Sequence, residues 1–570
     1  MTPRSRAAGI LLERDAAIEM RDGTLLRADV WRPQSSGRFP TLLQRFPYDK
    51  SAALASIVLA GVEPARAVQA GFVVVVQDTR GRFASDGVFT AFADEARDGA
   101  DTIAWIRKQP FSNGQVGMYG VSYGGATQLL AAGEHPKGLL AIAPHLAGSE
   151  TYEGWIYEGG AFRLGFALWW AANSFARAEL ARRRREGRDV ADLAAALETV
   201  LRDPWAAFRR LPLNGVEVLN ELFPSYRDWV EHPARDAYWR AGAFLERIGE
   251  PFCSSLHIGG WNDIFLAGTL RNHAALGGRL IVGPWAHAVP YDVIGEVDYG
   301  PEATQGSLDM SALQLGWFAE QMNAAGSPNR DDAAPVRLFV MGANRWRDEP
   351  AWPPARARET TLHLRSGGAL APDPAPSDEP PDTFVYDPLD PVPTTGGATF
   401  LPGLYVARHA GPQDQAAVEA RADVLTYTSD VLTRHTEITG HVTVILHAAS
   451  SAADTDWTAR LADVSPAGRS LGLLDGIVRA RYSRSTERAE LLERGRPHEF
   501  TIALGAISAV IEPGHRLRLQ ISSSNFPKFD RNPNHGGDIP RAEVSDYVSA
   551  EQTVFHDAAR PSRLIVPVVA

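Results

Sequence analysis

The segment that most constrains this chain runs from Gln115 to Gly125, where an apolar, strand-like stretch leads into a sharp turn and then into a helix-like run. At its centre, Gly120-Val121-Ser122-Tyr123-Gly124 fits the G-x-S-x-G pattern of a nucleophile elbow. In that motif small residues let two chain segments cross closely, while the strained serine presents its hydroxyl at the top of a sheet. The segment therefore predicts a strand–turn–helix unit with Ser122 as a nucleophile.

Strand-like and helix-like patterns alternate around this unit. The run from Phe72 to Gln77 is almost wholly apolar and rich in valine, as in a central parallel strand that is buried on both faces. Helical spacing follows through residues 96–106, and strand character returns at residues 116–119. Earlier strands are predicted at residues 17–20, 25–31 and 41–44. This alternation predicts an α/β sheet with helices on both faces.

The pattern changes between residues 150 and 242. This stretch is rich in tryptophan, tyrosine and alanine, has helical periods such as that of residues 190–201, and lacks clear strand alternation. Strands return at residues 254–258 and 280–282. We therefore predict a helical cap over residues 150–242, inserted into a discontinuous α/β domain of residues 1–149 and 243–352.

Past Trp352-Pro353-Pro354 the composition shifts to a segment rich in proline, aspartate and glycine, residues 367–397, which cannot hold a helix. Short strand-like runs separated by turn residues follow this segment. They lie at residues 424–428, 441–447, 458–464, 500–507 and 516–521. Residues 353–570 are therefore predicted to form an all-β sandwich of the jelly-roll type.

A serine hydroxyl needs a base that takes its proton and a carboxylate that orients the base. Two later loops offer these groups in the order acid, then histidine, that is typical of α/β-hydrolases. Asp263 follows the strand at residues 254–258, and His287 follows the strand at residues 280–282. Because functional groups in open α/β sheets gather beyond the carboxyl ends of the strands, we expect both side chains at the same edge as Ser122. The sequence thus predicts a Ser122–His287–Asp263 triad on an α/β-hydrolase fold.

Acyl transfer also requires hydrogen-bond donors for the oxyanion. The elbow predicts the backbone N–H of Tyr123 as one donor, and no His-Gly-Gly-Gly loop supplies a second. Tyr48, in the loop after an early strand, offers its phenolic hydroxyl, although local packing would also explain a tyrosine there. Metal-dependent hydrolysis is the rival mechanism. The sequence has neither H-E-x-x-H nor Cys-x-x-Cys, so we expect no metal and no cofactor.

Composition limits the possible partners and the cellular location of the protein. A net charge of −11 argues against nucleic acid as a partner, because its phosphates attract basic surfaces. Cys253 is the only cysteine, which excludes an intrachain disulfide and favours a cytoplasmic location. No segment approaches the roughly 20 apolar residues of a membrane helix, and the apolar stretch at residues 7–12 is short for a signal peptide. The expected partner is a small-molecule ester or amide substrate, with no nucleic acid and no membrane, and the sequence leaves open whether the chain forms a homo-oligomer.

Seven short segments, spread in order over nearly the whole chain, resemble those of the cocaine esterase/X-prolyl dipeptidyl aminopeptidase-like (CocE/NonD) acyl hydrolases. These segments are Arg45–Tyr48, Asp78–Arg82, Gly120–Gly124, Gly260–Asp263, Gly283–His287, Met341–Arg347 and Asp387–Gly397. The resemblance implies an α/β-hydrolase domain, a helical cap inserted after the nucleophile segment, and a C-terminal jelly roll. It also implies Ser122 as nucleophile, His287 as base, Asp263 as its partner and Tyr48 as the second oxyanion donor.

Substrate choice divides this family. Trp155, Trp170 and Phe265 can be aligned with an aromatic acyl pocket, although a packed cap core explains them equally well. The acidic cluster with which α-amino acid ester hydrolases bind a substrate ammonium group cannot be located in this sequence.

The sequence therefore predicts a serine hydrolase that cleaves carboxylic esters through an acyl-enzyme intermediate. The main alternative is an amidase or peptidase of the same family, such as an α-amino acid ester hydrolase, an acylase or an X-prolyl dipeptidyl peptidase, because the acyl-enzyme chemistry is shared. A second alternative is a carbohydrate-binding or adhesive protein with a vestigial hydrolase domain. The intact order of serine, aspartate and histidine disfavours that alternative.

Overall fold

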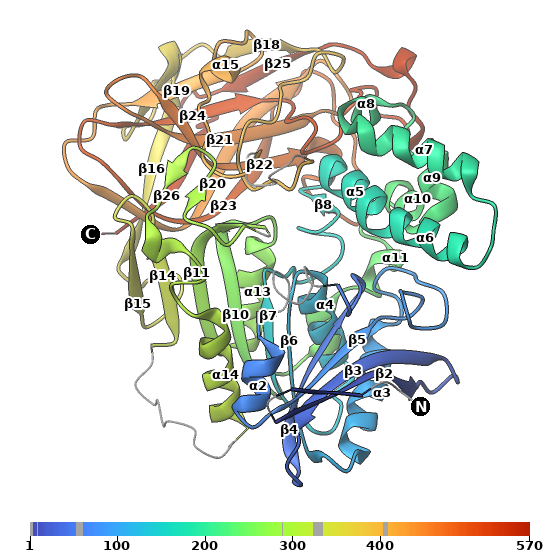
Figure 1. Ribbon diagram of the computed structural model, residues 1–570. Helices are drawn as coiled ribbons and strands as arrows, with labels where there is room; N and C mark the ends of the chain where they lie inside the picture. Colours follow the sequence, from blue (N-terminus) through green and yellow to red (C-terminus); the bar gives the residue numbers. More distant parts are fainter. Residues whose placement is uncertain are drawn as a thin grey trace.

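The computed structural model describes residues 4–7, 9–52, 61–287, 289–322, 334–402 and 409–569 (Figure 1). A largely parallel sheet flanked by helices lies in the lower half of Figure 1, and an antiparallel sheet lies in the upper half. Helices α5 to α10 form a separate group beside the antiparallel sheet, at the upper right of the view. This arrangement confirms the predicted fold class, an α/β-hydrolase domain with a helical insertion and a C-terminal all-β domain.

Within the described residues, eleven strands form the first sheet, in the order β1-β2-β3-β5-β4-β6-β7-β10-β11-β14-β15. The strands from β5 to β14 in that order run parallel, and the outer strands are antiparallel. Their bounds are β1 (Arg4–Ala7), β2 (Ile10–Glu19), β3 (Leu25–Pro33), β4 (Phe39–Phe46), β5 (Val73–Asp78), β6 (Ser112–Val121), β7 (Leu139–His145), β10 (Ser254–Asn262), β11 (Arg279–Ala286), β14 (Val336–Val340) and β15 (Arg345–Glu349).

Helices cover both faces of this sheet. The valines of β5 alternate between the two faces and pack against helices on each. Val73 and Val75 pack into one apolar cluster with α3 (Glu95–Lys108) and α4 (Tyr123–Ala132). Val74 and Val76 pack into another cluster with α2 (Pro64–Gln69) and α14 (Met310–Gln321). Among the described residues, α12 (Phe244–Ile248) and α13 (Leu266–Leu276) also lie near the sheet. The predicted central strand is thus buried on both sides.

The inserted segment is mainly helical. Its elements are α5 (Leu164–Trp170), a π-helical turn (Ala171–Ala176), α6 (Arg177–Arg185), α7 (Ala191–Arg202), α8 (Pro204–Arg209), α9 (Glu217–Leu222), α10 (Ser225–Glu231) and α11 (Ala237–Arg240). It also contains a hairpin of two short strands, β8 (Tyr157–Glu158) and β9 (Ala161–Phe162), which the sequence did not predict. Strands of two residues are too short to show an alternating pattern.

The second sheet is almost wholly antiparallel, and each predicted strand of the C-terminal region overlaps an observed strand. Its bounds are β16 (Ala357–Arg365), β17 (Ala369–Ala371), β18 (Asp382–Tyr386), β19 (Leu425–Ser429), β20 (Thr436–Ser450), β21 (Asp456–Val464), β22 (Ser470–Arg479), β23 (His498–Ile511), β24 (Arg516–Ser522), β25 (Ala550–Phe555) and β26 (Arg563–Val569). Smaller elements are β12 (Val293–Ile294), β13 (Val297–Asp298) and α15 (Ala416–Glu419).

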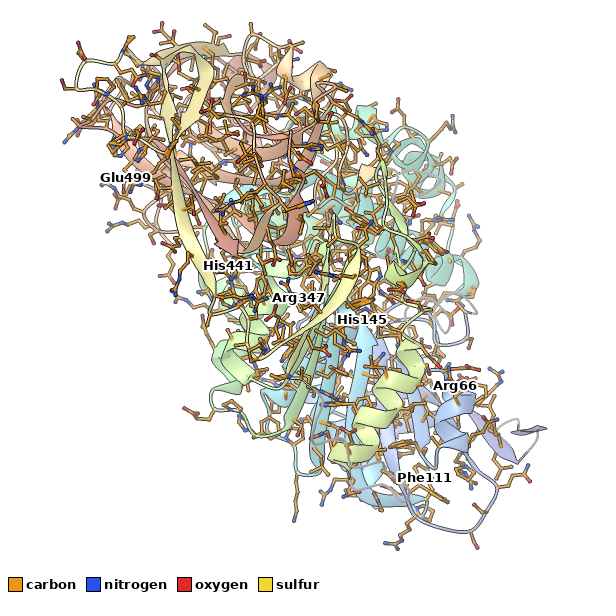
Figure 2. The ribbon with its side chains drawn as sticks, turned by 90° about the vertical axis from the view of Figure 1, so that its left-hand side faces the viewer. Arg66, Phe111, His145, Arg347, His441 and Glu499 are labelled. Carbon is orange, nitrogen blue, oxygen red and sulfur yellow. The ribbon has the colours of Figure 1, made fainter. Side chains whose placement is uncertain are left out.

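The two sheets are joined at the end of β14. The Met341 N–H donates to the Ser508 carbonyl at 3.0 Å, and the Val510 N–H donates to the Met341 carbonyl at 2.8 Å. Next to this bridge, Arg347 of β15 pairs with Glu437 of β20 at 2.6 Å, and Figure 2 shows Arg347 at the junction. The segment Met341–Arg347 therefore fastens the parallel sheet to the antiparallel one.

Candidate active site

Ser122 lies in a strained turn between β6 and α4. Its φ of 60° and ψ of −121° lie in a region that non-glycine residues rarely adopt. A Cβ at Gly125 would lie 2.5 Å from the Cβ of Ala147, so only glycine fits there. At Gly124 a Cβ would meet its nearest neighbour at an ordinary 3.6 Å. At Gly120, φ is 145° and a Cβ would lie 3.1 Å from the Gly124 carbonyl oxygen. The close approach at this turn therefore depends on Gly120 of the G-x-S-x-G pattern and on Gly125, one residue beyond it.

The structure brings Ser122, His287 and Asp263 together, although 165 positions separate the first two along the chain. His287 Nε2 lies 3.0 Å from Ser122 Oγ, and His287 Nδ1 lies 2.7 Å from Asp263 Oδ2. The other carboxylate oxygen accepts the Phe265 N–H at 2.8 Å. An Nδ1–H that donates to aspartate leaves the Nε2 lone pair facing the serine hydroxyl, as a general base requires.

A second histidine, His145, lies close to Ser122, His287 and Asp263, and no sequence pattern had marked it as part of the site. His145, labelled in Figure 2, ends β7. Its carbonyl accepts the Ser122 N–H at 2.9 Å, and its Nε2 lies 3.3 Å from Nε2 of Gln305. Burial lowers the pKa of His145 to about 4, and the nearby Asp263 only partly opposes this effect. The ring is thus neutral near pH 7 and adds no positive charge beside His287.

Tyr123, the residue after the serine, is anchored by its side chain. Its hydroxyl accepts the Phe92 N–H at 2.8 Å and donates to Glu95 Oε1 at 3.1 Å. Burial raises the pKa of Glu95 to about 7, although Arg45 lies 3.1 Å away. Tyr123 begins α4, and the first N–H groups of a helix have no intrahelical partner, so its backbone N–H can bind an oxyanion.

Tyr48, in the loop after β4, lies beside Tyr123. Its hydroxyl accepts the indole N–H of Trp170 at 3.0 Å, and its ring meets that of Tyr123 edge-on at 6.5 Å. Burial raises the pKa of Tyr48 well above its usual value, so the hydroxyl keeps its proton and can donate it in a hydrogen bond.

The loop that carries Tyr48 is held on both sides by the last residue of β5 and the loop that follows it. On one side, the Lys50 N–H donates to Asp78 Oδ1 at 2.8 Å and the Lys50 ammonium lies 3.3 Å from Asp78 Oδ2. On the other side, the Arg82 guanidinium donates to the Pro47 carbonyl at 3.1 Å. Burial raises the pKa of Asp78 to about 6, against the effect of Lys50. In the sequence, Asp78–Arg82 stands out only through its resemblance to the family, with no role indicated for either residue.

Trp170, Trp155 and Phe265 form a row of neighbouring rings, and Phe265 contacts His287. Trp155 packs on Phe265 at 4.2 Å between ring centroids, and Phe265 meets the His287 ring edge-on at 5.0 Å. Trp170 lies 6.0 Å from Trp155 and stacks on Phe166 at 5.2 Å. All four of these aromatic rings are buried.

A further ring comes from the C-terminal region, and sequence reasoning missed it. Phe400 meets the His287 ring edge-on at 5.3 Å and Phe166 at 5.9 Å. It lies in an irregular segment between β18 and α15, where no periodicity marks a buried face. The only sequence signal is its place three residues after the family-like Asp387–Gly397 segment. We call Trp155, Phe166, Trp170, Phe265 and Phe400 the aromatic cluster.

In the part of the chain that the structure describes, no group of three or more histidine, cysteine, aspartate or glutamate side chains could hold a metal ion. The groups assembled around Ser122 are a serine hydroxyl, an imidazole with a carboxylate partner, a backbone N–H and a phenolic hydroxyl. This set matches the requirements of acyl transfer.

Comparisons with known proteins agree with this chemistry. The family model for X-Pro dipeptidyl-peptidase (S15 family) matches residues 22–289, and the model for the C-terminal non-catalytic domain of X-Pro dipeptidyl-peptidase matches residues 329–565. The cocaine esterase of Rhodococcus sp. (strain MB1 Bresler) is 37% identical, over 97% of each chain.

Two solved structures share the fold over nearly the whole chain. An α-amino acid ester hydrolase superposes with a TM-score of 0.81 at 25% identity, covering 99% of this chain and 98% of its own. An aminopeptidase from the marine sediment archaeon Thaumarchaeota archaeon superposes with a TM-score of 0.84 at 24% identity, covering 100% of this chain and 98% of its own.

Proposed function

This chain belongs to the cocaine esterase/X-Pro dipeptidyl-peptidase (S15) family of hydrolases, and from that premise we propose that it cleaves carboxylic esters through an acyl-enzyme formed on Ser122. One observation carries the proposal. His287 has one ring nitrogen 3.0 Å from the serine oxygen and the other 2.7 Å from the Asp263 carboxylate. A serine held in this way can be deprotonated as it attacks.

In the acylation step, Ser122 Oγ attacks the ester carbonyl while His287 Nε2 takes the hydroxyl proton. Asp263 stabilises the imidazolium that results. The carbonyl oxygen becomes an oxyanion, which accepts hydrogen bonds from the Tyr123 backbone N–H and the Tyr48 hydroxyl. When the carbon–oxygen bond to the alcohol breaks, His287 returns the proton to the leaving oxygen.

Deacylation repeats these roles with water. His287 takes a proton from a water molecule as the water attacks the acyl carbonyl, and the same two donors bind the second oxyanion. His287 then protonates Ser122 Oγ as the acid leaves.

The aromatic cluster favours an acyl group with a flat, uncharged ring. Stacked and edge-on contacts with such a ring are worth about 0.5–1.5 kcal/mol each beyond the burial of area. The relative at 37% identity is named for an ester substrate, which supports esters over amides. A panel of matched p-nitrophenyl esters and p-nitroanilides tests this choice, and faster cleavage of the anilides would favour the amidase alternative.

Labelling by a fluorophosphonate tests the nucleophile. The native protein should form a covalent adduct at Ser122, and Ser122→Ala should form none. Because loss of a triad serine typically costs on the order of 10⁶ in kcat, Ser122→Ala should have almost no esterase activity. An unlabelled native protein would favour a binding function instead.

We also propose a cytoplasmic location and small-molecule substrates, with no nucleic-acid partner. The single cysteine and the net charge of −11 support these proposals. Within the described ranges, no helix has the length and apolar character needed to span a bilayer.

A further inference from the structure

The hydrogen bond between Trp170 and Tyr48 has only one possible direction. An indole N–H can donate but cannot accept, so the Tyr48 oxygen must be the acceptor of the 3.0 Å contact. A phenol has one proton, and this geometry leaves that proton free to point elsewhere. The Tyr48 ring meets that of Tyr123, the residue directly after Ser122, edge-on at 6.5 Å between ring centroids, which places Tyr48 beside the turn that carries the serine.

The indole is itself held firmly. Trp170 is 5% exposed and is stacked between Phe166 at 5.2 Å and Trp229 at 5.6 Å, with interplanar angles of 19° and 13°. It ends α5 at the start of the π-helical turn Ala171–Ala176, and turns of this kind are frequent at functional sites.

The same turn is tied to the loop that holds Tyr48. Arg82 donates to the Ser174 carbonyl at 3.0 Å as well as to the Pro47 carbonyl. The position of the indole and the position of the tyrosine therefore depend on one guanidinium.

From these contacts we propose that Trp170 is a positioning residue for the oxyanion donor. Its N–H occupies the acceptor side of the Tyr48 hydroxyl and leaves the single Tyr48 proton directed at the developing oxyanion. This inference rests on the proposed function, because it assumes that Tyr48 binds the oxyanion of an acyl-transfer step.

Trp155 offers a matched control. It is a buried tryptophan of the same aromatic cluster, but its indole N–H has no hydrogen-bond partner among the described residues. Trp155→Phe and Trp170→Phe therefore make the same chemical change, and only the second removes a hydrogen bond to Tyr48.

The test is a double-mutant cycle on the acylation rate constant, measured from the p-nitrophenol burst with a p-nitrophenyl ester. Since one oxyanion donor is worth about 10² to 10³ in rate, a misdirected donor should lose part of that factor, and Trp170→Phe should slow acylation about 10-fold. In a Tyr48→Phe background it should slow acylation less than about 2-fold, because no hydroxyl remains to be directed. Trp155→Phe should change KM by the same factor in both backgrounds.

Equal slowing by Trp170→Phe in the two backgrounds, or an effect on KM alone, would overturn the inference. If Trp170→Phe fails to fold, 3-benzothienylalanine at position 170 keeps the shape of the indole and lacks the N–H, and it should give the same coupling to Tyr48. Full acylation by that analogue would overturn the inference as well. Fluorophosphonate labelling separates the two proposals, because a native protein that is labelled but shows no coupling retains the proposed function.

Discussion

Two regions of the chain contact His287, the α/β region with polar groups and the ring of Phe265, and the C-terminal region with the ring of Phe400. Ser122, Asp263 and His287 itself follow strands of the parallel sheet, and Tyr48 follows β4 of the same sheet. From the C-terminal region, Phe400 contacts the imidazole through its ring edge. Under the proposed function, we therefore expect the first region to set the rate of the chemical step and Phe400 to influence which acyl group fits.

Both regions also contain buried ionic clusters, and each cluster holds a different segment of the chain in place. Asp78 and Arg82 hold the backbone on either side of Tyr48. In the C-terminal region, Arg479 binds Asp456 and Asp530 at 2.8 Å each, and Asp530 accepts the Phe162 N–H of the inserted segment at 2.9 Å. The first cluster supports Tyr48, the proposed oxyanion donor, and the second holds the inserted segment.

Arg479→Met should give the largest effect, and it should be an effect on stability. The substitution leaves two buried carboxylates without their cation, which typically costs about 3–5 kcal/mol. We expect a marked fall in Tm, while kcat of the folded protein changes little.

Thermal unfolding and active-site titration measure these two quantities separately. Arg337→Met is the control, because Arg337 forms an exposed pair with Asp348 and such pairs contribute about 0–1 kcal/mol. Two results would contradict the proposed division of roles between the two regions. One is an Arg479→Met variant that is as stable as the native protein, and the other is a fully folded Arg479→Met variant with a much lower kcat.

The second-largest effect should be on the pH dependence of stability, through a buried histidine of the parallel sheet. His257 of β10 is fully buried, and burial lowers its pKa to about 3. Between that value and the ordinary histidine pKa of about 6.5, the unfolded chain binds a proton that the folded chain does not. This group therefore lowers stability as the pH falls below about 6.5, by at most about 1.4 kcal/mol per pH unit.

His257→Leu should remove that contribution and flatten the plot of Tm against pH between 4 and 6.5. His435→Leu, at an exposed position of the C-terminal region, should leave the plot unchanged. Parallel plots for native protein and His257→Leu would contradict the assignment.

Asp78→Asn should then lower kcat with little change in KM. It removes the charge that pairs with Lys50 and weakens the anchor of the Tyr48 loop, and a displaced oxyanion donor should cost about 10-fold in rate. Asp29→Asn is a matched control, because Asp29 also faces the Lys50 ammonium, at 3.8 Å, and Asp78 is the carboxylate that accepts the Lys50 backbone N–H. Equal losses of kcat in the two variants would show that charge, rather than the loop anchor, matters.

How much of this could be predicted from the sequence depends on how each residue is positioned. Asp263 and His287 could be proposed because each directly follows an apolar strand, and parallel strands end at one edge of a sheet. The central strand could be predicted from its run of valines.

The contacts of Trp170 and Phe400 could not be predicted. Trp170 lies 122 positions from Tyr48, and no local pattern records their hydrogen bond. Phe400 follows a segment rich in proline and glycine, where periodicity gives no information about burial. Asp78 and Arg82 could be recognised only as parts of a familiar motif, because the Lys50 N–H and the Pro47 carbonyl that they bind are backbone groups, which leave no trace in side-chain patterns.

Phe400→Leu should give the smallest effect, and it should fall on substrate choice. An aromatic contact contributes about 0.5–1.5 kcal/mol, so kcat/KM for p-nitrophenyl benzoate should fall about 2- to 10-fold. The rate with p-nitrophenyl acetate should stay the same, because an acetyl group does not reach the ring. The two esters share a leaving group, so their ratio isolates the acyl group. Phe384→Leu, in the C-terminal core against Trp457, should lower stability without changing the ratio. If Phe400→Leu slows both esters equally, the antiparallel region acts on the His287 imidazole itself, and the division of roles between the two sheets is wrong.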